Sequence, residues 1–491
     1  MQQTQASTLR RRLLGLALGL IAALGINAPT GAAFVNISGA GRHVIEAASE
    51  DSGPTRYTAT HHVRCDASGS GNGLTYETAW TPTQAKAAVA GNIVQWHPGS
   101  GGLCQFAPTG NDDGAWAPTN SGTSGSPIIH YASYAATFLS TPTSNANRTE
   151  LSHSGNGTSN AQRSAIIDSG GQSNVIFDGF LVNWANAKPA IDGGWFNIGG
   201  QAGGYENVQI LNTYIQAAED TIGGNYPAVW VEGVDGFVFS GNVVRDLSSS
   251  TDTSQNVAAV ITYGCENMVV SYNTLINVQT GFYIKGSATG MQNSGTISYN
   301  LIQDVTRGMR IADVSATTRL VVSFNLITDF SVYGILITSN GADDGRMTDL
   351  FSNTIARTSG TPGALISVNE TTGTTIRIRD NVLFNDNDST GFFDAGEYSQ
   401  PWQVLDYQWH VQNPGTFQAS YNGSNATSLA AWRTLTGAEA NSTVTATIPF
   451  VDAANDDFAV TGAPTTASST GGPVGCCNGA ELPGFKLVSG L

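Results

Sequence analysis

The sequence predicts an all-β fold in which the chain winds into a single-stranded parallel β-helix, a solenoid of short strands with long loops between them. A segment made of an apolar strand and an asparagine recurs along the middle of the chain. The copies are 25 to 31 residues apart, which is too irregular for stacked helical repeats but suits coils whose loops differ in length. Gly is frequent, with 58 residues, and only 12% of residues are charged, as is typical of short strands joined by tight turns.

The repeated asparagine predicts one corner of the coil. The clearest copies are Val-Val-Ser-Tyr-Asn at 269–273, Thr-Ile-Ser-Tyr-Asn at 296–300 and Val-Val-Ser-Phe-Asn at 321–325, each followed by a second apolar strand and a third strand led by glycine. Asparagine tolerates a left-handed backbone, and its side chain can hydrogen-bond to the same position of the next coil. We therefore expect an asparagine ladder formed by Asn212, Asn242, Asn273, Asn300, Asn325, Asn353 and Asn381.

The N-terminus predicts export. Three arginines at 10–12 precede an apolar run from Leu13 to Ile26, and small residues follow at 31–33. The run is shorter than the roughly 20 apolar residues that span a bilayer, so we interpret residues 1–33 as a signal peptide and expect a secreted protein, extracellular or periplasmic, with no membrane span. The remaining chain is divided into an N-terminal extension at 34–61, the β-helix at 62–463 and a C-terminal tail at 464–491.

Cysteines and charge narrow the classes of partner. Cys65 and Cys104 flank the start of the expected coil and can pair as a disulfide in an exported protein. The spacing of the five cysteines is not that of a zinc site. The formal net charge of −16 opposes nucleic-acid binding, which needs a basic face. It also disfavours an acidic polymer unless a local basic patch offsets the field.

The third strand of each coil predicts which side chains face outward, because side chains alternate between the two faces of a strand. Aligning the copies places two apolar columns inside the coil: Val229, Val260, Phe282, Met309 and Ile335, and Val231, Thr262, Ile284, Ile311 and Ile337. The residues between them face outward: Trp230, Ile261, Tyr283 and Arg310 in one column, and Glu232, Tyr263, Lys285 and Ala312 in the next.

Two of these outward residues form a candidate catalytic pair. Lys285 and Arg310 stand on successive coils, and strand geometry puts their Cα atoms roughly 8 Å apart. Eliminative cleavage of a uronic-acid polymer needs a base and a cation that stabilises the enolate-like intermediate. Lysine with its pKa lowered by a neighbouring positive charge is a credible base, and arginine can hold a carboxylate with two hydrogen bonds.

The start of the expected coil resembles a known superfamily. The segment 62–73, Ala79-Trp80, a short helix expected around Thr83 to Ala90 and the strand segment 91–94 are similar to the opening of pectate-lyase-like proteins. The resemblance extends roughly from His62 to Ala463. It implies a right-handed parallel β-helix with an N-terminal capping helix, and a polysaccharide as the partner; it specifies chemistry only weakly.

A more local resemblance concerns the candidate pair. The stretch 281–287, continued to Arg310, is similar to the lysine and arginine coils of chondroitinase B and the related alginate lyases. This likeness implies that Lys285 is the base and that Arg310 assists protonation or substrate binding. Those enzymes carry acidic calcium ligands one strand before the lysine, where this chain has Thr280, Gly281 and Phe282. The sequence therefore leaves a calcium cofactor open, and this resemblance does not identify its ligands.

The other outward residues are candidates for substrate binding. Trp230, Tyr263 and Tyr283 can stack on the apolar faces of sugar rings, and Glu232 is a candidate acid or metal ligand, with Asp313 nearby. The main hypothesis is a polysaccharide lyase that acts by β-elimination. Two alternatives stay open: a glycoside hydrolase, which needs a pair of carboxylates, and a non-catalytic carbohydrate-binding or adhesion protein.

Overall fold

The structure is a computed structural model of the chain. It describes residues 35–37, 42–44, 57–98, 103–106, 116–132, 150–153, 167–169, 171–183, 194–200, 202–216, 227–248, 256–286, 291–338, 347–357, 363–369, 375–386, 391–398, 400–412, 416–452, 457–460, 467–470 and 474–476. The predicted signal peptide at 1–33 lies outside these residues.

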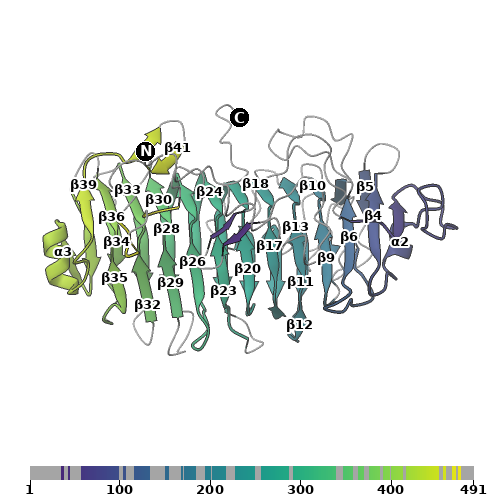
Figure 1. The fold of residues 1–491 in the computed structure, drawn as a ribbon, viewed down its shortest axis with the longest axis horizontal. Helices are drawn as coiled ribbons and strands as arrows, with labels where there is room; N and C mark the ends of the chain where they lie inside the picture. The colour runs from purple at the N-terminus through teal and green to yellow at the C-terminus, as the bar shows by residue number, and fades with distance from the viewer. Residues whose placement is uncertain are drawn as a thin grey trace, which may run out of the picture.

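Three long sheets of parallel strands run side by side along the molecule (Figure 1). The first sheet consists of β3 (His61–Arg64), β4 (Ile93–His97), β6 (Ile128–Ala132), β9 (Val175–Asp178), β13 (Gln209–Leu211), β17 (Val238–Ser240), β20 (Met268–Ser271), β23 (Gly295–Ser298), β26 (Leu320–Ser323), β29 (Met347–Phe351), β32 (Thr375–Arg379) and β35 (Val404–Asp406).

The second sheet consists of β5 (Leu103–Phe106), β7 (Glu150–His153), β10 (Leu181–Asn183), β14 (Tyr214–Gln216), β18 (Val243–Leu247), β21 (Thr274–Val278), β24 (Leu301–Gln303), β27 (Leu326–Thr328), β30 (Thr354–Arg357), β33 (Val382–Asn385), β36 (Trp409–Gln412) and β39 (Thr443–Thr445).

The third sheet consists of β8 (Ile167–Asp168), β11 (Phe196–Gly199), β15 (Val229–Glu232), β19 (Ala258–Tyr263), β22 (Thr280–Lys285), β25 (Val305–Ile311), β28 (Phe330–Thr338), β31 (Ala364–Asn369), β34 (Gly391–Ala395), β37 (Ala419–Tyr421) and β38 (Ser424–Ala426). Three further strand pairs are β1 (Val35–Ile37) with β2 (Arg42–Val44), β12 (Tyr205–Glu206) with β16 (Val234–Asp235), and β40 (Phe450–Asp452) with β41 (Asp457–Val460).

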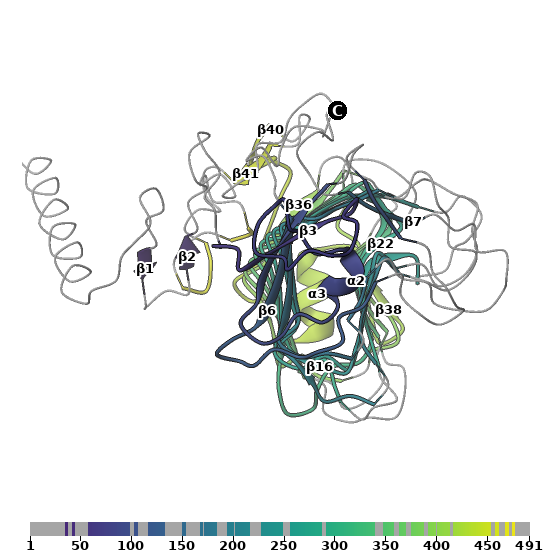
Figure 2. The ribbon, with the colours of Figure 1, turned by 90° about the vertical axis from the view of Figure 1, so that its right-hand side faces the viewer.

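Each coil contributes one strand to each sheet. Strands β20, β21 and β22 follow one another along the chain and pair in parallel with β23, β24 and β25 of the next coil. Figure 2 looks along the coil and shows the sheets enclosing one interior. The prediction of an all-β, single-stranded parallel solenoid is confirmed.

A ladder of buried amides fixes the corner between the first and second sheets. The Nδ2 of each asparagine donates to the Oδ1 of the next, at 2.8 to 3.0 Å, from Asn242 through Asn273, Asn300, Asn325 and Asn353 to Asn381. Gln408 continues the ladder by accepting from Asn381 at 3.0 Å. All six asparagines are fully buried, so the ladder satisfies polar groups that burial would otherwise penalise.

The predicted ladder is wrong at its first member. Strand register pairs Leu211 with Ser240, so Thr213 takes the position that Asn242 occupies in the next coil, and the Thr213 backbone N–H donates to Asn242 Oδ1 at 2.9 Å. Asn212 precedes the ladder by one residue and has a φ of 47°. Its side chain donates instead to Asp178 Oδ1 at 2.8 Å.

The left-handed backbone conformation, predicted for the repeated asparagines, is found instead at the residue before each ladder asparagine. Positive φ values belong to Tyr272, Tyr299, Phe324 and Ser352, each directly before a ladder asparagine. The aromatic members stack on one another, with ring centroids 5.1 Å apart for Tyr272 and Tyr299 and 5.0 Å for Tyr299 and Phe324. The asparagines therefore contribute hydrogen bonds, while the residues directly before them make the bend.

The interior columns of the third sheet are confirmed. Val260, Phe282, Met309 and Ile335 are register partners on successive strands and belong to the main hydrophobic core. The second column, which includes Ile284, Ile311 and Ile337, lies in the same core. Stacked apolar side chains of this kind bury continuous surface between neighbouring coils, which stabilises the solenoid.

Helices are few in the described part of the chain. α2 (Pro82–Ala85) begins after a capping box at Thr81, and it is shorter than the helix expected at 83–90. A helix that caps the N-terminal end of the coil stays a prediction. α3 (Leu429–Thr436) lies at the opposite end of the coil (Figure 1), where Trp432 is fully buried and stacks on Phe393 at 5.5 Å.

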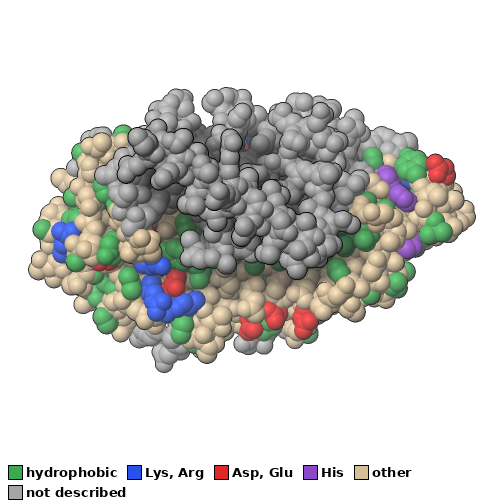
Figure 3. All heavy atoms as spheres, in the orientation of Figure 1, with side chains coloured by type: hydrophobic (Ala, Val, Ile, Leu, Met, Phe, Trp, Pro, Cys, Tyr) green, Lys and Arg blue, Asp and Glu red, His purple; other side chains and the backbone are tan. Residues whose placement is uncertain are grey.

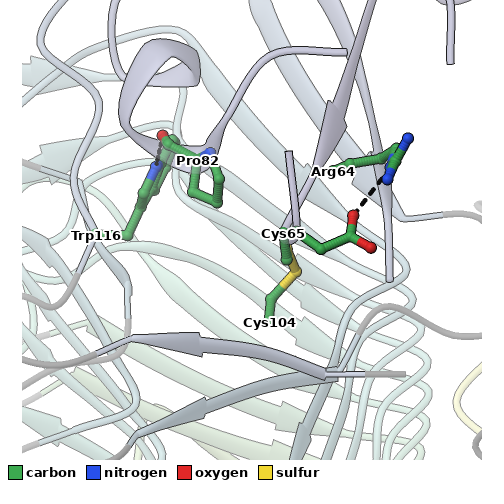
Figure 4. The surroundings of a disulfide bond; sticks show 6 residues. Arg64, Cys65, Pro82, Cys104 and Trp116 are labelled. Atoms are coloured by element: carbon green, nitrogen blue, oxygen red, sulfur yellow. Dashed lines mark hydrogen bonds and ion pairs between the residues drawn. A yellow bond between two sulfur atoms is a disulfide. The ribbon is translucent and has the colours of Figure 1, made fainter. Parts of the chain in front are cut away.

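The predicted disulfide is confirmed. Cys65 and Cys104 are bonded, with their Cα atoms 5.1 Å apart (Figure 4). Beside the bridge, Arg64 forms an ion pair with Asp66 at 2.9 Å. The bond joins the end of β3 to β5, so it links the first sheet to the second at the start of the coil.

The described residues of the expected C-terminal tail contact the coil. The backbone N–H of Gly475 donates to the carbonyl of Asp380 at 2.8 Å, and that of Cys476 donates to Thr354 Oγ1 at 3.1 Å. Val474 and Cys476 pack against the outer side chains of the second sheet. Within the described ranges no helix has the length and apolar character needed to cross a membrane.

Candidate functional site

The third sheet brings the predicted site residues onto one outer face. Register pairs Trp230 with Ile261, Ile261 with Tyr283, and Tyr283 with Arg310. The next column pairs Glu232 with Tyr263 and Tyr263 with Lys285. Ile261, Tyr283 and Ala312 form, with Ala258, an apolar cluster that is separate from the main core. The predicted grouping of these residues on the outer face is confirmed, while their roles stay predictions.

Lys285 stands at the end of β22, half-buried in this face. Its Nζ donates to the hydroxyl of Tyr263 at 3.1 Å and to Oδ1 of Asn256 at 3.4 Å. Burial lowers the pKa of the Lys285 ammonium below its ordinary value, and the positive charge of Arg310 lowers it further. The sequence predicted the effect of the neighbouring charge but not the larger effect of desolvation.

Tyr283 lies between the two predicted catalytic cations. The Lys285 ammonium is 5.4 Å from the centre of its ring and the Arg310 guanidinium carbon is 4.8 Å from it. Cations at such distances are attracted to the ring face. Tyr283 is only 4% exposed, so it acts on the site by positioning the cations, and the structure does not present its ring for stacking on a sugar.

Trp230 and Tyr263 stack on each other, with ring centroids 4.7 Å apart. The Lys285 ammonium also lies 5.1 Å from the centre of the Tyr263 ring. Trp230 is 7% exposed and Glu232 4%, so neither is an open binding surface. Of the four residues predicted to bind substrate, Tyr263 alone is more than marginally exposed, and the others support the site from beneath.

Sequence reasoning missed a third cation and a phenol. Arg307 on β25 is in register with Tyr333 on β28, next to the Arg310 column. The positive charges of Arg307 and Arg310 both lower the pKa of Tyr333, but burial outweighs them and raises it to about 12. The Tyr333 hydroxyl has no hydrogen-bond partner among the described residues. We name Lys285, Arg307 and Arg310 the cationic patch.

Asn293 holds the two strands of the site in place, and it too was missed. Its Nδ2 donates to the carbonyl oxygens of Lys285 and Asp313, both at 2.8 Å. Its Oδ1 accepts from Thr262 Oγ1 at 2.9 Å and from the Cys265 N–H at 3.1 Å. Asn293 is fully buried and therefore fixes the C-terminal end of β22 relative to the coils on either side.

The acidic residues that the structure describes do not form a metal centre. Asp313 lies against the backbone at Gly286, where an added Cβ would meet its Oδ2. Among the described residues there is no group of three or more His, Cys, Asp or Glu side chains able to hold a metal ion. Calcium takes six to eight oxygen ligands; a calcium cofactor therefore stays an expectation, and no step below depends on one.

The first sheet presents a different kind of charged surface. Figure 3 shows the molecule from the side of the first sheet. Basic and acidic side chains lie close together there, toward the C-terminal strands of the sheet. There Arg319 forms an ion pair with Asp349 at 2.6 Å, and Arg377 approaches the same carboxylate at 3.9 Å. An acid therefore neutralises these cations.

Comparison with known proteins supports the architecture. A family described as a right-handed beta helix region matches residues 196–346. This match agrees with the right-handed parallel β-helix that the sequence predicts. Comparison with curated protein sequences finds no match.

Similar solved structures include polysaccharide lyases and a glycoside hydrolase. A lacto-N-biosidase of family GH136 from Eubacterium ramulus is 11% identical, with 74% of this chain and 61% of that chain covered and a TM-score of 0.36. A pectate lyase is 13% identical over 69% of this chain and 81% of its own, with a TM-score of 0.31. A PL6 family polysaccharide lyase from Pseudopedobacter saltans is 12% identical over 80% and 97%, also with a TM-score of 0.31. Likenesses this weak carry no argument about activity.

Proposed function

We propose that this protein is an exported polysaccharide lyase that cleaves a uronic-acid-containing polysaccharide by β-elimination at the cationic patch. The observation that carries the proposal is the pairing of a partly desolvated lysine with two arginines on one outer face. Lys285 has a lowered pKa beside Arg310, and Arg307 lies on the same strand as Arg310. In a chain of net charge −16, the placement of Lys285 beside Arg310 offers a local site for an anion.

The base of the reaction is Lys285 in its neutral form. Its Nζ takes the proton from the sugar carbon next to the carboxylate. The electron pair of that C–H bond forms the new carbon–carbon double bond, and the bond to the glycosidic oxygen breaks. Arg310 and Arg307 hold the carboxylate and offset the negative charge that builds up on it, as guanidinium groups can do with paired hydrogen bonds.

The acid of the reaction is Tyr333. A pKa of about 12 keeps its hydroxyl protonated at neutral pH, so the group can donate a proton to the departing glycosidic oxygen. The proton that Lys285 has gained returns to solvent, and Tyr333 regains one from solvent, which restores both groups for the next turnover.

The test is a product assay with the full chain. Incubation with polygalacturonate, alginate and glycosaminoglycans should release unsaturated uronate, detected by its ultraviolet absorbance. Lys285→Ala should lower kcat by about 10² to 10⁴, the usual contribution of a general base. Lys86→Ala is the matched control, because Lys86 follows α2 at the far end of the coil.

Other outcomes of this assay would select another function. A wild-type protein that releases no unsaturated product from any of these polymers would contradict the proposal. New reducing ends without unsaturated product would instead indicate a glycoside hydrolase, and binding without turnover would indicate a carbohydrate-binding protein.

A further inference from the structure

A groove opens on the outer face of the third sheet, toward its C-terminal end. It has a volume of about 560 Å³ and is lined by residues of β31, β34, β37 and β38 and their flanks. Five lining residues are glycine or alanine: Gly363, Ala364, Gly391, Ala419 and Ala426. Gly363, Ala364 and Gly391 carry little or no side chain and are not part of the main hydrophobic core, so the sheet surface is hollow here.

A hairpin forms one side of the groove. β38 folds back antiparallel on β37, whereas the other strand pairs of the third sheet are parallel among the residues that the structure describes. The two turn residues, Asn422 and Gly423, have φ values of 47° and 74°, as a two-residue hairpin with matching twist requires. The hairpin places the exposed residues Asn425 and Thr427 in the groove lining.

Three further polar side chains of the lining suit sugar hydroxyls. Asp394, Gln418 and Ser420 add a carboxylate, an amide and a hydroxyl to the lining, and Ser420 Oγ donates to Asp394 Oδ1 at 2.8 Å. Together these groups offer both donors and acceptors, which a sugar hydroxyl needs because it does both. A few such groups in an otherwise small-residue hollow are typical of a ligand site.

Charge separates this groove from the cationic patch. Asp394 is the single charged residue among those that line the groove. Arg357 lies behind Gly363, since a Cβ on that glycine would be 3.1 Å from its Nη1, but Arg357 is fully buried and is not part of the lining. A uronate carboxylate in the groove would meet the negative charge of Asp394 and would be disfavoured.

Strand register connects the groove to the cationic patch. Arg310, Leu336, Ser367 and Asp394 are successive register partners on β25, β28, β31 and β34. Arg310 and Asp394 are therefore three strand spacings apart, roughly 14 Å. A short oligosaccharide that crosses the strands can reach from one to the other.

We propose that this groove binds an uncharged sugar residue of the same polysaccharide whose uronate lies at Lys285 and Arg310. The substrate is then a mixed polymer that contains both uronate and neutral sugars, and a pure polyuronate is a poorer ligand. The placement of the uronate at Lys285 and Arg310 rests on the proposed function. Binding of a neutral sugar in the groove can be tested by itself.

The test is binding of neutral hexasaccharides of glucose, mannose and xylose to the full chain, measured by saturation-transfer NMR and calorimetry. At least one should bind. Asp394→Ala should weaken it about fivefold, as expected for the loss of one hydrogen-bond acceptor. Ser424→Ala is the matched control, because Ser424 is exposed on β38 and does not line the groove. Asp394→Lys should make hexagalacturonate bind at least about tenfold more tightly.

The inference fails if no neutral hexasaccharide binds, or if Asp394→Ala leaves the affinity unchanged. Lys285→Ala separates this failure from failure of the proposed function. That variant should bind the neutral hexasaccharide as the wild type does, while it loses any release of unsaturated uronate. A neutral ligand that is lost in Lys285→Ala would overturn the placement of the sugar in the groove.

Discussion

The Nζ of Lys285 lies 3.1 Å from the hydroxyl of Tyr263, its register partner on the preceding coil. The Tyr263 ring is itself fixed by stacking on Trp230 at 4.7 Å. The proposed base is therefore held by the stacking of coils, at a position that three successive strands determine. Rigid elements of this kind position catalytic groups more accurately than loops do.

The pH dependence of the elimination rate should change when the positive charge next to Lys285 is removed. The rate should rise with pH as Lys285 loses its proton, since the neutral amine is the base. Arg310 lowers the pKa of Lys285, so Arg310→Gln should raise that pKa and move the rising limb of kcat/KM to higher pH. Arg319→Gln, which removes a cation from the first sheet, is the control. An unmoved limb in Arg310→Gln would contradict the assignment of the base.

Tyr333→Phe should lower kcat by about 10² to 10⁴ and leave the fold intact. The fold should persist because the hydroxyl makes no hydrogen bond with described residues and the ring is kept. If Tyr333 protonates the leaving oxygen, Tyr333→Phe should lower kcat much less with a substrate that has an activated aryl leaving group than with the polysaccharide. Tyr421→Phe, which removes a hydroxyl bonded to the Gln400 carbonyl, should leave kcat unchanged. Equal losses on both substrates would argue against an acid role.

Asn300→Ala should lower the free energy of unfolding by about 2 to 4 kcal/mol. Asn300 Oδ1 accepts from both the backbone and the side-chain nitrogen of Asn273, at 3.0 and 2.9 Å, and its loss leaves those buried donors unpaired. Urea unfolding followed by circular dichroism measures the change. Asn441→Ala, at an exposed asparagine, should cost far less, and similar losses in the two variants would show that the ladder does not stabilise the coil.

The repeat predicted the coil, and it predicted which side chains of the third strand point outward. Both features depend on a pattern of burial that recurs along the chain. Alternation alone placed Lys285, Arg310, Tyr263 and Tyr283 on one outer face, and the register agrees. The same alignment placed Asn212 in the ladder. In the sequence, an asparagine one residue before the ladder position looks the same as an asparagine at that position. A one-residue shift is visible only once the strands are paired.

The sequence was less informative where a residue acts through distant partners. Asn293 and Tyr333 have no local pattern that marks them, and their roles come from contacts between coils. α3 was missed although its signals are local: Ser428 caps its first turn and Gly437 ends it with a φ of 66°.

Removal of the Cys65–Cys104 disulfide should lower the free energy of unfolding by about 4 kcal/mol. The bond closes a sequence separation of 39 residues, and without it the unfolded chain gains conformational entropy. The double variant Cys65→Ser with Cys104→Ser, compared with the wild type under non-reducing conditions, measures the loss. Cys265→Ser, at a free buried cysteine, is the control for a sulfur-to-oxygen change.

His130 should make the N-terminal coils sensitive to acid. Its ring is fully buried and lies 4.9 Å from Trp116 and 5.9 Å from Phe177, measured between ring centroids. Burial lowers the pKa of His130 to about 3, whereas the unfolded chain has the ordinary value near 6.5. As the pH falls below 6.5, protons therefore bind the unfolded state first, and stability is lost until the folded pKa is reached.

Between pH 7 and pH 4 this one group should cost about 3 kcal/mol of unfolding free energy. His130→Gln keeps an acceptor for the Trp96 Nε1–H, which donates to His130 Nδ1 at 3.3 Å, and removes the titration. The variant should lose less stability than the wild type over the same range, in urea unfolding at each pH. His97, whose pKa is lowered to about 4 mainly by burial, remains in both proteins and cancels in the comparison. Parallel curves for the two proteins would mean that His130 is protonated in the folded state near its ordinary pKa.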